Sequence, residues 1–295
     1  MRNPRVGILT DSVADLPRSL IERFQVRVVP AYLMLDGQSY PDDGTLDSEW
    51  FYDQLRTGKR QLTTAAPPPG EFLAAYQAMV AEGFEEIVAL LTASRVSSLY
   101  HHARVAARAF GEEYGSKVRL HLIDTQQVSM GMGWMVVCVG ELIAQRVPAD
   151  EIASRVRHMR DRTRIIGVLD SIDYLRRSGR VGWVAGKVAS LLQIRPLIGF
   201  YRGEAQLLGR VRTYWRALRA MVERVREMVP LERLAILHSH ATTEHIEQLQ
   251  HWVSEMAPNL EVPIVDIGAV FATHVGPGCL GVALVAASPD RFGYA

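Results

Sequence analysis

The feature that most constrains the fold is a regular alternation of short apolar runs and helix-like stretches in the first half of the chain. Runs of this length are typical of strands, and the longer stretches between them are typical of helices. Strands separated by helices favour a mostly parallel, Rossmann-like sheet that is covered on both faces. We expect Asp15 to cap the first helix, which begins near Leu16-Pro17. The other elements predicted here are the strands Val6–Leu9, Val26–Leu33, Glu86–Leu91 and Val118–Ile123 and the helices Glu71–Ala81, Leu99–Phe110 and Val128–Gln145.

The pattern changes after a charged helix predicted over Asp150–Arg164, which we interpret as a connector. Tyr201–Glu204 then lies as a hairpin turn between two strand-like runs, and a hairpin requires antiparallel pairing. We therefore expect two α/β domains, residues 1–163 with the mostly parallel sheet and residues 164–295 with a mixed sheet. The strands predicted in the second domain are Ile165–Leu169, Arg195–Phe200, Gln206–Val211, Arg233–His238, Val262–Ile267 and Gly281–Ala286.

Composition narrows the class of protein. With 295 residues, 48% of them hydrophobic, the chain can bury a sizeable core, and a net charge of +1 gives no electrostatic case for nucleic acid. Its longest apolar run, Gly131–Ile143, is interrupted by Glu141 and too short for stable membrane insertion. Cys138 and Cys279 are far apart, which argues against a disulfide framework. Because residues 1–5 lead directly into a strand, we expect no signal peptide and a cytoplasmic location.

Several standard catalytic and cofactor signatures are missing from the sequence. The segment Gly182–Val188 has one residue too few for a phosphate loop, and a valine stands where Ser or Thr should hold magnesium. Gly131-Met-Gly133 lacks the third glycine of a dinucleotide fingerprint. His238 and His240 share one face of a predicted strand, as in a metal site, although such histidines are more often polar residues at a strand end. We expect no cofactor and no metal.

Small hydroxyl residues gather at the ends of predicted strands. In a parallel sheet these loops emerge at the carboxyl edge, where open α/β folds bind ligands. Any one of these residues is most simply a helix cap, but four such loops on one edge indicate a binding site. His274 adds an imidazole on a glycine-proline loop late in the chain. The hydroxyl clusters are Thr10–Ser12, Thr63–Thr64, Thr92–Ser98 and Asp124–Ser129.

The same segments resemble the motifs of the DegV family of bacterial fatty-acid-binding proteins, in the family's order and over nearly the whole chain. Departures from the family pattern include Ala65 and Ala66 in place of Ser and Gln, and Ser98 and Leu99 in place of Gly and Thr. The matches are TDSxxDL at Thr10–Leu16, TTSQP at Thr63–Pro67, SSxLSGTY at Ala93–Tyr100, YLxxGGRI at Tyr174–Val181, IKP at Ile194–Pro196 and HxGPG at His274–Gly278.

The resemblance implies two α/β domains with a long-chain fatty acid buried in a tunnel between them. It also implies a carrier that is not itself an enzyme and that presents the fatty acid carboxylate to a separate fatty acid kinase, which feeds lipid metabolism. The residues that the resemblance assigns to the carboxylate are Thr63, Thr64, Ser94, Ser97 and His274, and those facing the partner and its phosphate are Arg180 and Arg176.

Physical chemistry sets the demands of such a site. Burying a sixteen-carbon tail gains roughly 0.8 kcal/mol per methylene, so the tail needs an apolar tunnel. Candidate walls are Val28–Met34 and the flexible side chains of Met130, Met132 and Met135, although ordinary core packing explains these residues equally well. A buried carboxylate needs hydrogen-bond donors, and hydroxyl groups leave its oxygen freer to attack a phosphate than a tight arginine pair would.

Two other functions are compatible with these residues. Ser94 and His274 could serve a hydrolase or transferase, although neither an acid partner nor a nucleophile elbow is identifiable. Alternatively, the protein could sense a lipid without handing it on.

Overall fold

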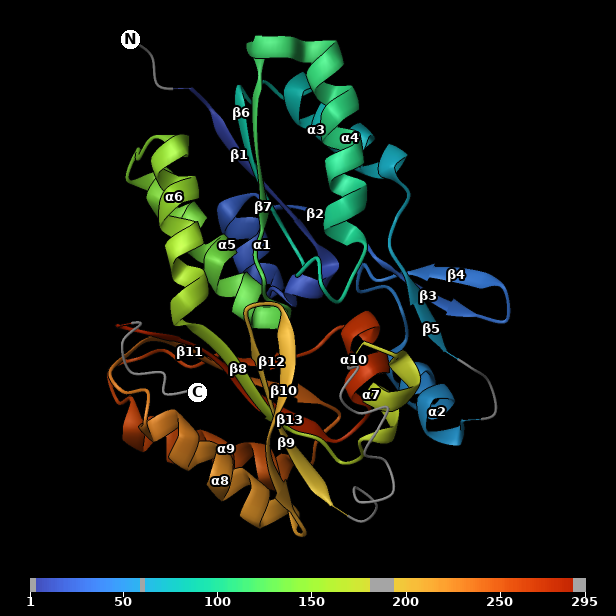
Figure 1. Ribbon diagram of the computed structural model, residues 1–295, viewed down its shortest axis with the longest axis vertical. Coiled ribbons are helices and arrows are strands. Elements are labelled where there is room, and N and C mark those ends of the chain that lie inside the picture. Colours follow the sequence, from blue (N-terminus) through green and yellow to red (C-terminus); the bar gives the residue numbers. More distant parts are fainter. Residues whose placement is uncertain (1–3, 59–61, 181–193, 289–295) are drawn as a thin grey trace.

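The structure, a computed structural model that describes residues 4–58, 62–180 and 194–288, shows two α/β domains stacked along the long axis (Figure 1). The first domain contains a four-stranded sheet in the order β2-β1-β6-β7, and every neighbouring pair is parallel. This confirms the parallel sheet expected from the alternating pattern. Its strands are β1 (Val6–Asp11), β2 (Arg27–Val29), β6 (Glu86–Leu91) and β7 (Arg119–Asp124).

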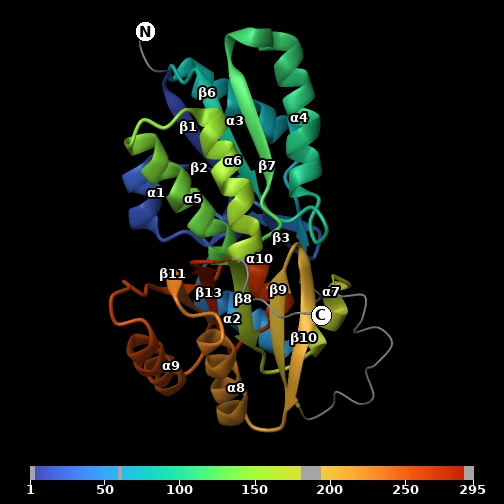
Figure 2. The same cartoon turned by 60° about the vertical axis from the view of Figure 1, so that its left-hand side comes forward.

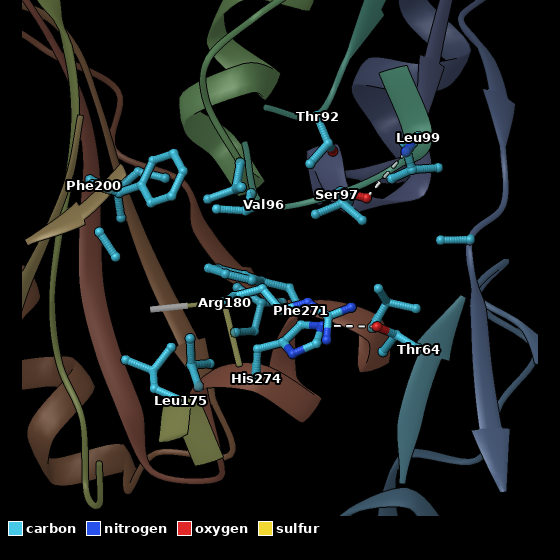
Figure 3. A pocket seen from close by; sticks show the side chains of 18 of the residues that line it. Thr64, Thr92, Val96, Ser97, Leu99, Leu175, Arg180, Phe200, Phe271 and His274 are labelled. Atoms are coloured by element: carbon cyan, nitrogen blue, oxygen red, sulfur yellow. Dashed lines mark hydrogen bonds between the residues drawn. The ribbon is translucent and has the colours of Figure 1, made fainter. Parts of the chain in front are cut away.

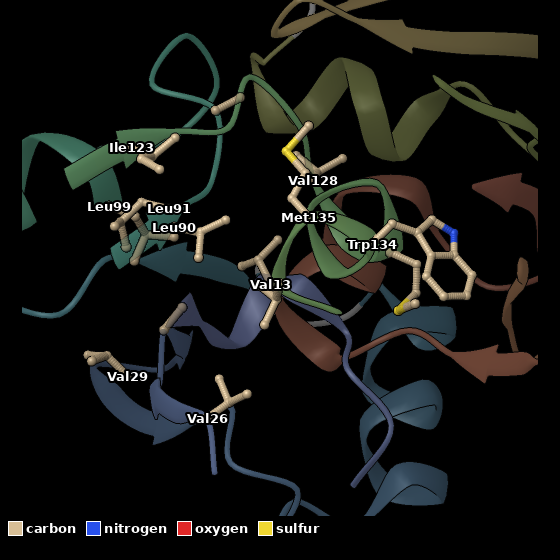
Figure 4. Packing of buried hydrophobic residues seen from close by; sticks show 14 of the residues in the cluster. Val13, Val26, Val29, Leu90, Leu91, Leu99, Ile123, Val128, Trp134 and Met135 are labelled. Carbon is tan, nitrogen blue, oxygen red and sulfur yellow. The ribbon is translucent and has the colours of Figure 1, made fainter. Parts of the chain in front are cut away.

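Helices cover both faces of this sheet: α3 and α4 lie on one face, and α1, α5 and α6 lie on the other (Figures 1 and 2). All six residues of β6 are buried, because this strand has a neighbour on each side and helices above and below. Figure 4 shows part of the resulting core, where Leu90, Leu91 and Ile123 lie near Leu99 of α4. The helices are α1 (Arg18–Phe24), α3 (Pro69–Ala81), α4 (Leu99–Tyr114), α5 (Ser129–Ala144) and α6 (Ala149–Met159).

The second domain contains a six-stranded mixed sheet in the order β10-β9-β8-β13-β11-β12, in which only β11 and β12 pair in parallel. The predicted hairpin at Tyr201–Glu204 is confirmed, because β9 and β10 pair across it. Helices α8 (Tyr214–Arg226) and α9 (Thr243–Met256) cover the face that points away from the first domain. The strands are β8 (Thr163–Val168), β9 (Arg195–Tyr201), β10 (Glu204–Val211), β11 (Leu231–Ser239), β12 (Ile264–Asp266) and β13 (Cys279–Ala286).

Helix α5 belongs to both domains. It packs against β1 and β6 of the first sheet and against β8, β11 and β13 of the second. Helix α5 is apolar over most of its surface, and 12 of its 16 residues are buried. The Nε1 group of Trp134 also donates a hydrogen bond to the carbonyl of Ala283, at 3.1 Å.

A segment of the first half of the chain forms a third, smaller sheet beside the two domains. Its antiparallel order is β4-β3-β5, and it packs with α2 against α10 from the end of the chain. Helix α7 lies next to α10 (Figure 1). The elements are β3 (Tyr32–Leu35), β4 (Gln38–Pro41), α2 (Ser48–Thr57), β5 (Thr63–Ala65), α7 (Asp173–Ser178) and α10 (Ala269–Val275).

The prediction of one strand over Val26–Leu33 is wrong. Strand β2 ends at Val29, and Tyr32 begins a strand of a different sheet. Pro30 lies between them, and because proline has no backbone N–H it interrupts the ladder where the chain changes sheets.

Two helix boundaries also differ from the prediction. Asp15 does not cap α1; it has a left-handed φ of 49°, and its carboxylate accepts hydrogen bonds from Ser129 and Gly268 instead. The charged helix expected over Asp150–Arg164 ends at Met159, because the chain continues through a 3-10 turn into β8. The domain division at residue 163 stays a prediction.

No helix within the described ranges combines the length and the apolar character needed to cross a bilayer. The segment Gly182–Val188, which resembles a phosphate loop superficially, lies outside the described residues.

Candidate functional site

A cavity of about 370 Å³ lies between the two domains, where the carboxyl edge of the parallel sheet meets the inner face of the mixed sheet. Its size is within the range of small-molecule sites. The floor comes from alternate residues of β8 and its extension, Ile165, Gly167 and Leu169, while Ile166 and Val168 point to the opposite face beneath α8 and α9.

Two glycines make the floor deep at its centre. Gly167 of β8 stands directly opposite Gly281 of β13, and Leu237 and Ile198 flank the pair on the neighbouring strands. A Cβ at Gly281 would lie 2.7 Å from the carbonyl oxygen of Ile166, so that position admits no side chain. A Cβ at Gly167 would meet its nearest atoms at 3.7–3.8 Å, which is ordinary contact, so this glycine leaves room that a side chain could fill.

The first domain and α10 supply the other walls. The loop after β6 contributes Val96, the start of α4 contributes Leu99, and α10 contributes Phe271 (Figure 3). The loop after β1 contributes Val13, and α10 also contributes Val270. These side chains are apolar, so the greater part of the wall is hydrocarbon.

The cavity has a polar end, where the two halves of the chain meet. The Thr64 hydroxyl of β5 and Nε2 of His274 on α10 lie 3.0 Å apart in a hydrogen bond (Figure 3). Burial, together with the nearby positive charge of Arg180, lowers the pKa of His274 to about 4, so its imidazole is neutral at pH 7. The second ring nitrogen, Nδ1, is buried and has no hydrogen-bond partner.

Arg180 connects this end with a second, smaller cavity of about 80 Å³. Thr64, Arg180 and His274 line both cavities, so the smaller cavity lies next to the polar end of the large one. The smaller cavity is also lined by Thr63 and Arg177. Cationic and hydroxyl donors therefore line the small cavity, next to the polar end of the large one.

The hydroxyl residues predicted for the site are not all brought together. Ser97 lines the large cavity, and its Oγ accepts a hydrogen bond from the backbone N–H of Leu99 at 3.3 Å. Thr63 lines only the small cavity. Ser94 lines neither, because its hydroxyl donates to the carboxylate of Asp124 at 2.5 Å.

Other candidates also lie elsewhere. Arg176 is exposed, forms an ion pair with Asp173 at 3.1 Å and lines neither cavity. The methionines Met130, Met132 and Met135, predicted as possible tunnel walls, are fully buried in α5 and do not line the cavity. Of the segment Val28–Met34, only Ala31 reaches it.

Residues that sequence reasoning missed include much of the wall. Phe271 and Val270 precede His274 on α10, and Phe200 and Ile198 lie on β9. Their alternation and helical spacing predict a buried face, but nothing local distinguishes a face that packs from one that borders a cavity.

Four of the departures from the family motifs, Ala65, Ala66, Ser98 and Leu99, line the large cavity. These substitutions therefore change the wall of the cavity, whereas Thr64, Ser97 and His274 are retained.

Ser94 and His274, the pair considered for a hydrolase, have different partners. Ser94 donates to Asp124 and His274 bonds to Thr64, so no hydrogen bond joins the two. Across the described part of the chain, no group of three or more His, Cys, Asp or Glu residues could hold a metal ion. His238 and His240 instead lie beside Asp266 and Glu49, respectively.

Fold and site together define a two-domain α/β protein that encloses an apolar cavity with one polar end between a parallel and a mixed sheet. Comparison with known proteins agrees with this class. Residues 5–287 match the family model described as "Uncharacterised protein, DegV family". The chain belongs to the DegV family.

Individual relatives cover almost all of the chain. A DegV domain-containing protein of Deinococcus radiodurans is 30% identical over 282 residues, which are 95% of this chain and 98% of the relative. Among solved structures, one described as "Fatty Acid Binding of a DegV family Protein" from Thermus thermophilus aligns with a TM-score of 0.85 and 27% identity, covering 96% of this chain and 99% of that one. A DegV lipid-binding protein from Thermotoga maritima aligns with a TM-score of 0.83 and 25% identity, with coverage of 96% and 99%.

Proposed function

We propose that this protein binds one long-chain fatty acid in the large cavity and presents its carboxylate, at the polar end, to a separate fatty acid kinase. The observation that carries the proposal is a cavity with mostly hydrocarbon walls and a polar cluster, Thr64, His274 and Arg180, at one end. A fatty acid has the same division into a long apolar part and one polar end. The relatives described as fatty-acid-binding and lipid-binding support this assignment.

The tail supplies most of the binding free energy. Each methylene that leaves water for the cavity gains about 0.8 kcal/mol before ordering costs. Gly167 and Gly281 leave a trough in the cavity floor, because neither has a side chain. This trough gives the acyl tail a path along the sheet.

The head group needs donors that are not already used. The Oγ of Ser97 accepts a hydrogen bond from Leu99, so its own hydrogen remains available to a carboxylate. Thr64 and the neutral His274 share one hydrogen bond, and the pair can still offer a donor to an incoming oxygen. These neutral donors satisfy a carboxylate without neutralising its charge, and an ionised oxygen is the nucleophile that phosphoryl transfer requires.

The small cavity lies on the side from which the phosphoryl group would approach in the proposed transfer step. The carboxylate would lie at the boundary that Thr64, Arg180 and His274 share, with the small cavity on its far side. A phosphoryl group delivered there by the partner kinase would meet Arg177 and Arg180, whose positive charge stabilises the developing negative charge. In this scheme the protein is a carrier, acting in the cytoplasm, and the kinase performs the chemistry.

Bound lipid is the direct test of the proposal. Protein purified from a bacterial host should carry about one fatty acid per chain, visible by native mass spectrometry as a mass increment of that size. Only the bare polypeptide after incubation with palmitate or oleate would contradict binding.

The head-group assignment predicts different effects for two hydroxyl residues. Thr64→Val removes a donor from a buried carboxylate while keeping the side-chain shape, and should weaken palmitate binding by about 1–3 kcal/mol in titration calorimetry. Ser94→Ala is the matched control, because its hydroxyl bonds Asp124 outside the cavity. An equal loss in both variants would return Ser94 to the head-group set, and no loss in Thr64→Val would exclude Thr64.

The trough predicts a change in chain-length preference. Gly167→Val should project two methyl groups into the cavity and weaken stearate more than myristate, by about 0.8 kcal/mol for each methylene excluded. Gly209→Val in β10 is the control, because a Cβ there also meets its neighbours at 3.7–3.8 Å but lies outside the cavity. Unchanged chain preference in Gly167→Val would place the tail elsewhere.

The kinase step predicts a separation of rate from affinity. Arg180→Ala should slow acyl-phosphate formation about 10²-fold at saturating lipid, because charge develops on the phosphoryl group only during transfer, and should change palmitate affinity much less. Arg176→Ala should leave the rate near that of the wild type, since Arg176 lines neither cavity. Formation of acyl phosphate from a fatty acid kinase and ATP, at an equal rate for wild type and Arg180→Ala, would confine the protein to lipid storage or sensing.

A further inference from the structure

Two buried carboxylates of the first domain meet the start of helix α10. Asp15 follows the first strand, and its Oδ1 accepts a hydrogen bond from the backbone N–H of Gly268 at 2.9 Å. Its other oxygen accepts from the hydroxyl of Ser129, the first residue of α5, at 2.5 Å. One side chain therefore joins the loop after β1, the start of α5 and the start of α10.

Asp42 approaches the same point from the end of β4. Burial raises the pKa of Asp42, while the nearby Ser12 side chain and the backbone N–H groups of Ala269 and Val270 lower it. Its Oδ2 is buried and has no hydrogen-bond partner. The first N–H groups of any helix lack acceptors within the helix. Here Asp15 accepts from Gly268, the residue before α10, and Asp42 lies beside the next two N–H groups.

Gly268 makes this close approach possible. A Cβ at that position would lie 3.1 Å from both oxygens of Asp42 and 3.2 Å from Oδ1 of Asp15. A side chain there would force the carboxylates or the start of α10 to shift by a few tenths of an ångström.

The other end of α10 is fixed within the second domain and at the cavity. The ring of Tyr174 packs so closely over Gly276, just beyond the helix, that a Cβ there would lie 2.2 Å from it. The carbonyl of Gly276 accepts a hydrogen bond from Ser239 of β11 at 2.6 Å. Between the two ends, Val270, Phe271, His274 and Val275 line the cavity.

We infer that Asp15 is a positioning residue for the polar end of the cavity: it holds the start of α10 against the first domain and thereby fixes His274 beside Thr64. Asp15 does not line the large cavity, so its action on the cavity passes through the helix. Only the role of His274 in binding a head group rests on the proposed function. The placement of His274 can be measured without lipid.

The test follows the His274 ring in the lipid-free full-length protein by an NMR pH titration, with its signal assigned by its loss in His274→Gln. In the wild type the pKa of His274 is lowered to about 4 by burial and by the charge of Arg180. If α10 is released, the ring gains water and moves away from Arg180, so both causes weaken. In Asp15→Ala the pKa should therefore rise by at least one unit, towards the ordinary value of about 6.5.

Further variants separate positioning from general loss of stability. Asp15→Asn keeps an acceptor for the N–H of Gly268 and should restore the low pKa of His274. Gly268→Ala keeps both carboxylates but forces a shift where they meet the helix start, so it should raise the pKa as Asp15→Ala does, and it carries the test if Asp15→Ala fails to fold. Asp43→Ala is the matched control, because Asp43 is the exposed neighbour of Asp42 and its carboxylate bonds to Thr45 within its own turn.

Palmitate affinity, measured on the same variants, distinguishes this inference from the proposed function. A raised His274 pKa with about tenfold weaker palmitate binding would support both. A raised pKa with unchanged affinity would support the positioning role and remove His274 from the head-group site. An unchanged His274 pKa in Asp15→Ala and Gly268→Ala would overturn the positioning role, whatever the lipid affinity.

Discussion

The hydrogen bond between Thr64 and His274 is the contact on which the cavity's polar end depends, because it joins residues 210 positions apart in the sequence across the meeting of the two domains. Both partners sit on short elements, β5 and α10, which could not hold this geometry alone. They hold it because β5 belongs to a small sheet packed on α10 and because α10 is fixed at both ends. A neutral imidazole suits this place, since a charged one buried beside Arg180 would be costly.

Much of the fold could be predicted from the sequence because its signals are local. The apolar run Glu86–Leu91 has the length and composition of a central parallel strand, and the turn at Tyr201–Glu204 is sufficient to imply antiparallel pairing. At Asp15 the prediction failed because of long-range contacts. Asp15 has the chemistry of a helix cap next to a helix start, yet its two oxygens accept from Ser129 and from Gly268, which are 114 and 253 positions away. No local pattern contains those partners.

The sequence was sufficient to predict a polar site at this place, but not which residues line it. Hydroxyl groups at strand ends and a histidine on a glycine-proline loop indicated a polar site, and Thr64, Ser97 and His274 do line the cavity. Ser94 and Ser97 are nevertheless indistinguishable in sequence, and a single hydrogen bond to Asp124 separates them. Likewise, the methionines of α5 fill the core, because that helix is enclosed by both sheets and has no face left for a cavity.

The position of β13 has a consequence for the order in which the protein can be built. This strand, the last one described in the chain, lies in the middle of the mixed sheet, between β8 and β11. During synthesis on a ribosome, β8 and β11 are made before β13, the strand that pairs with both. Until residues 279–286 have emerged, the edges of β8 and β11 that face β13 stay unpaired. Gly281 then brings the backbone that completes the cavity floor. The binding compartment is thus among the last features that the nascent chain can acquire, so a truncated product would have no compartment to fill.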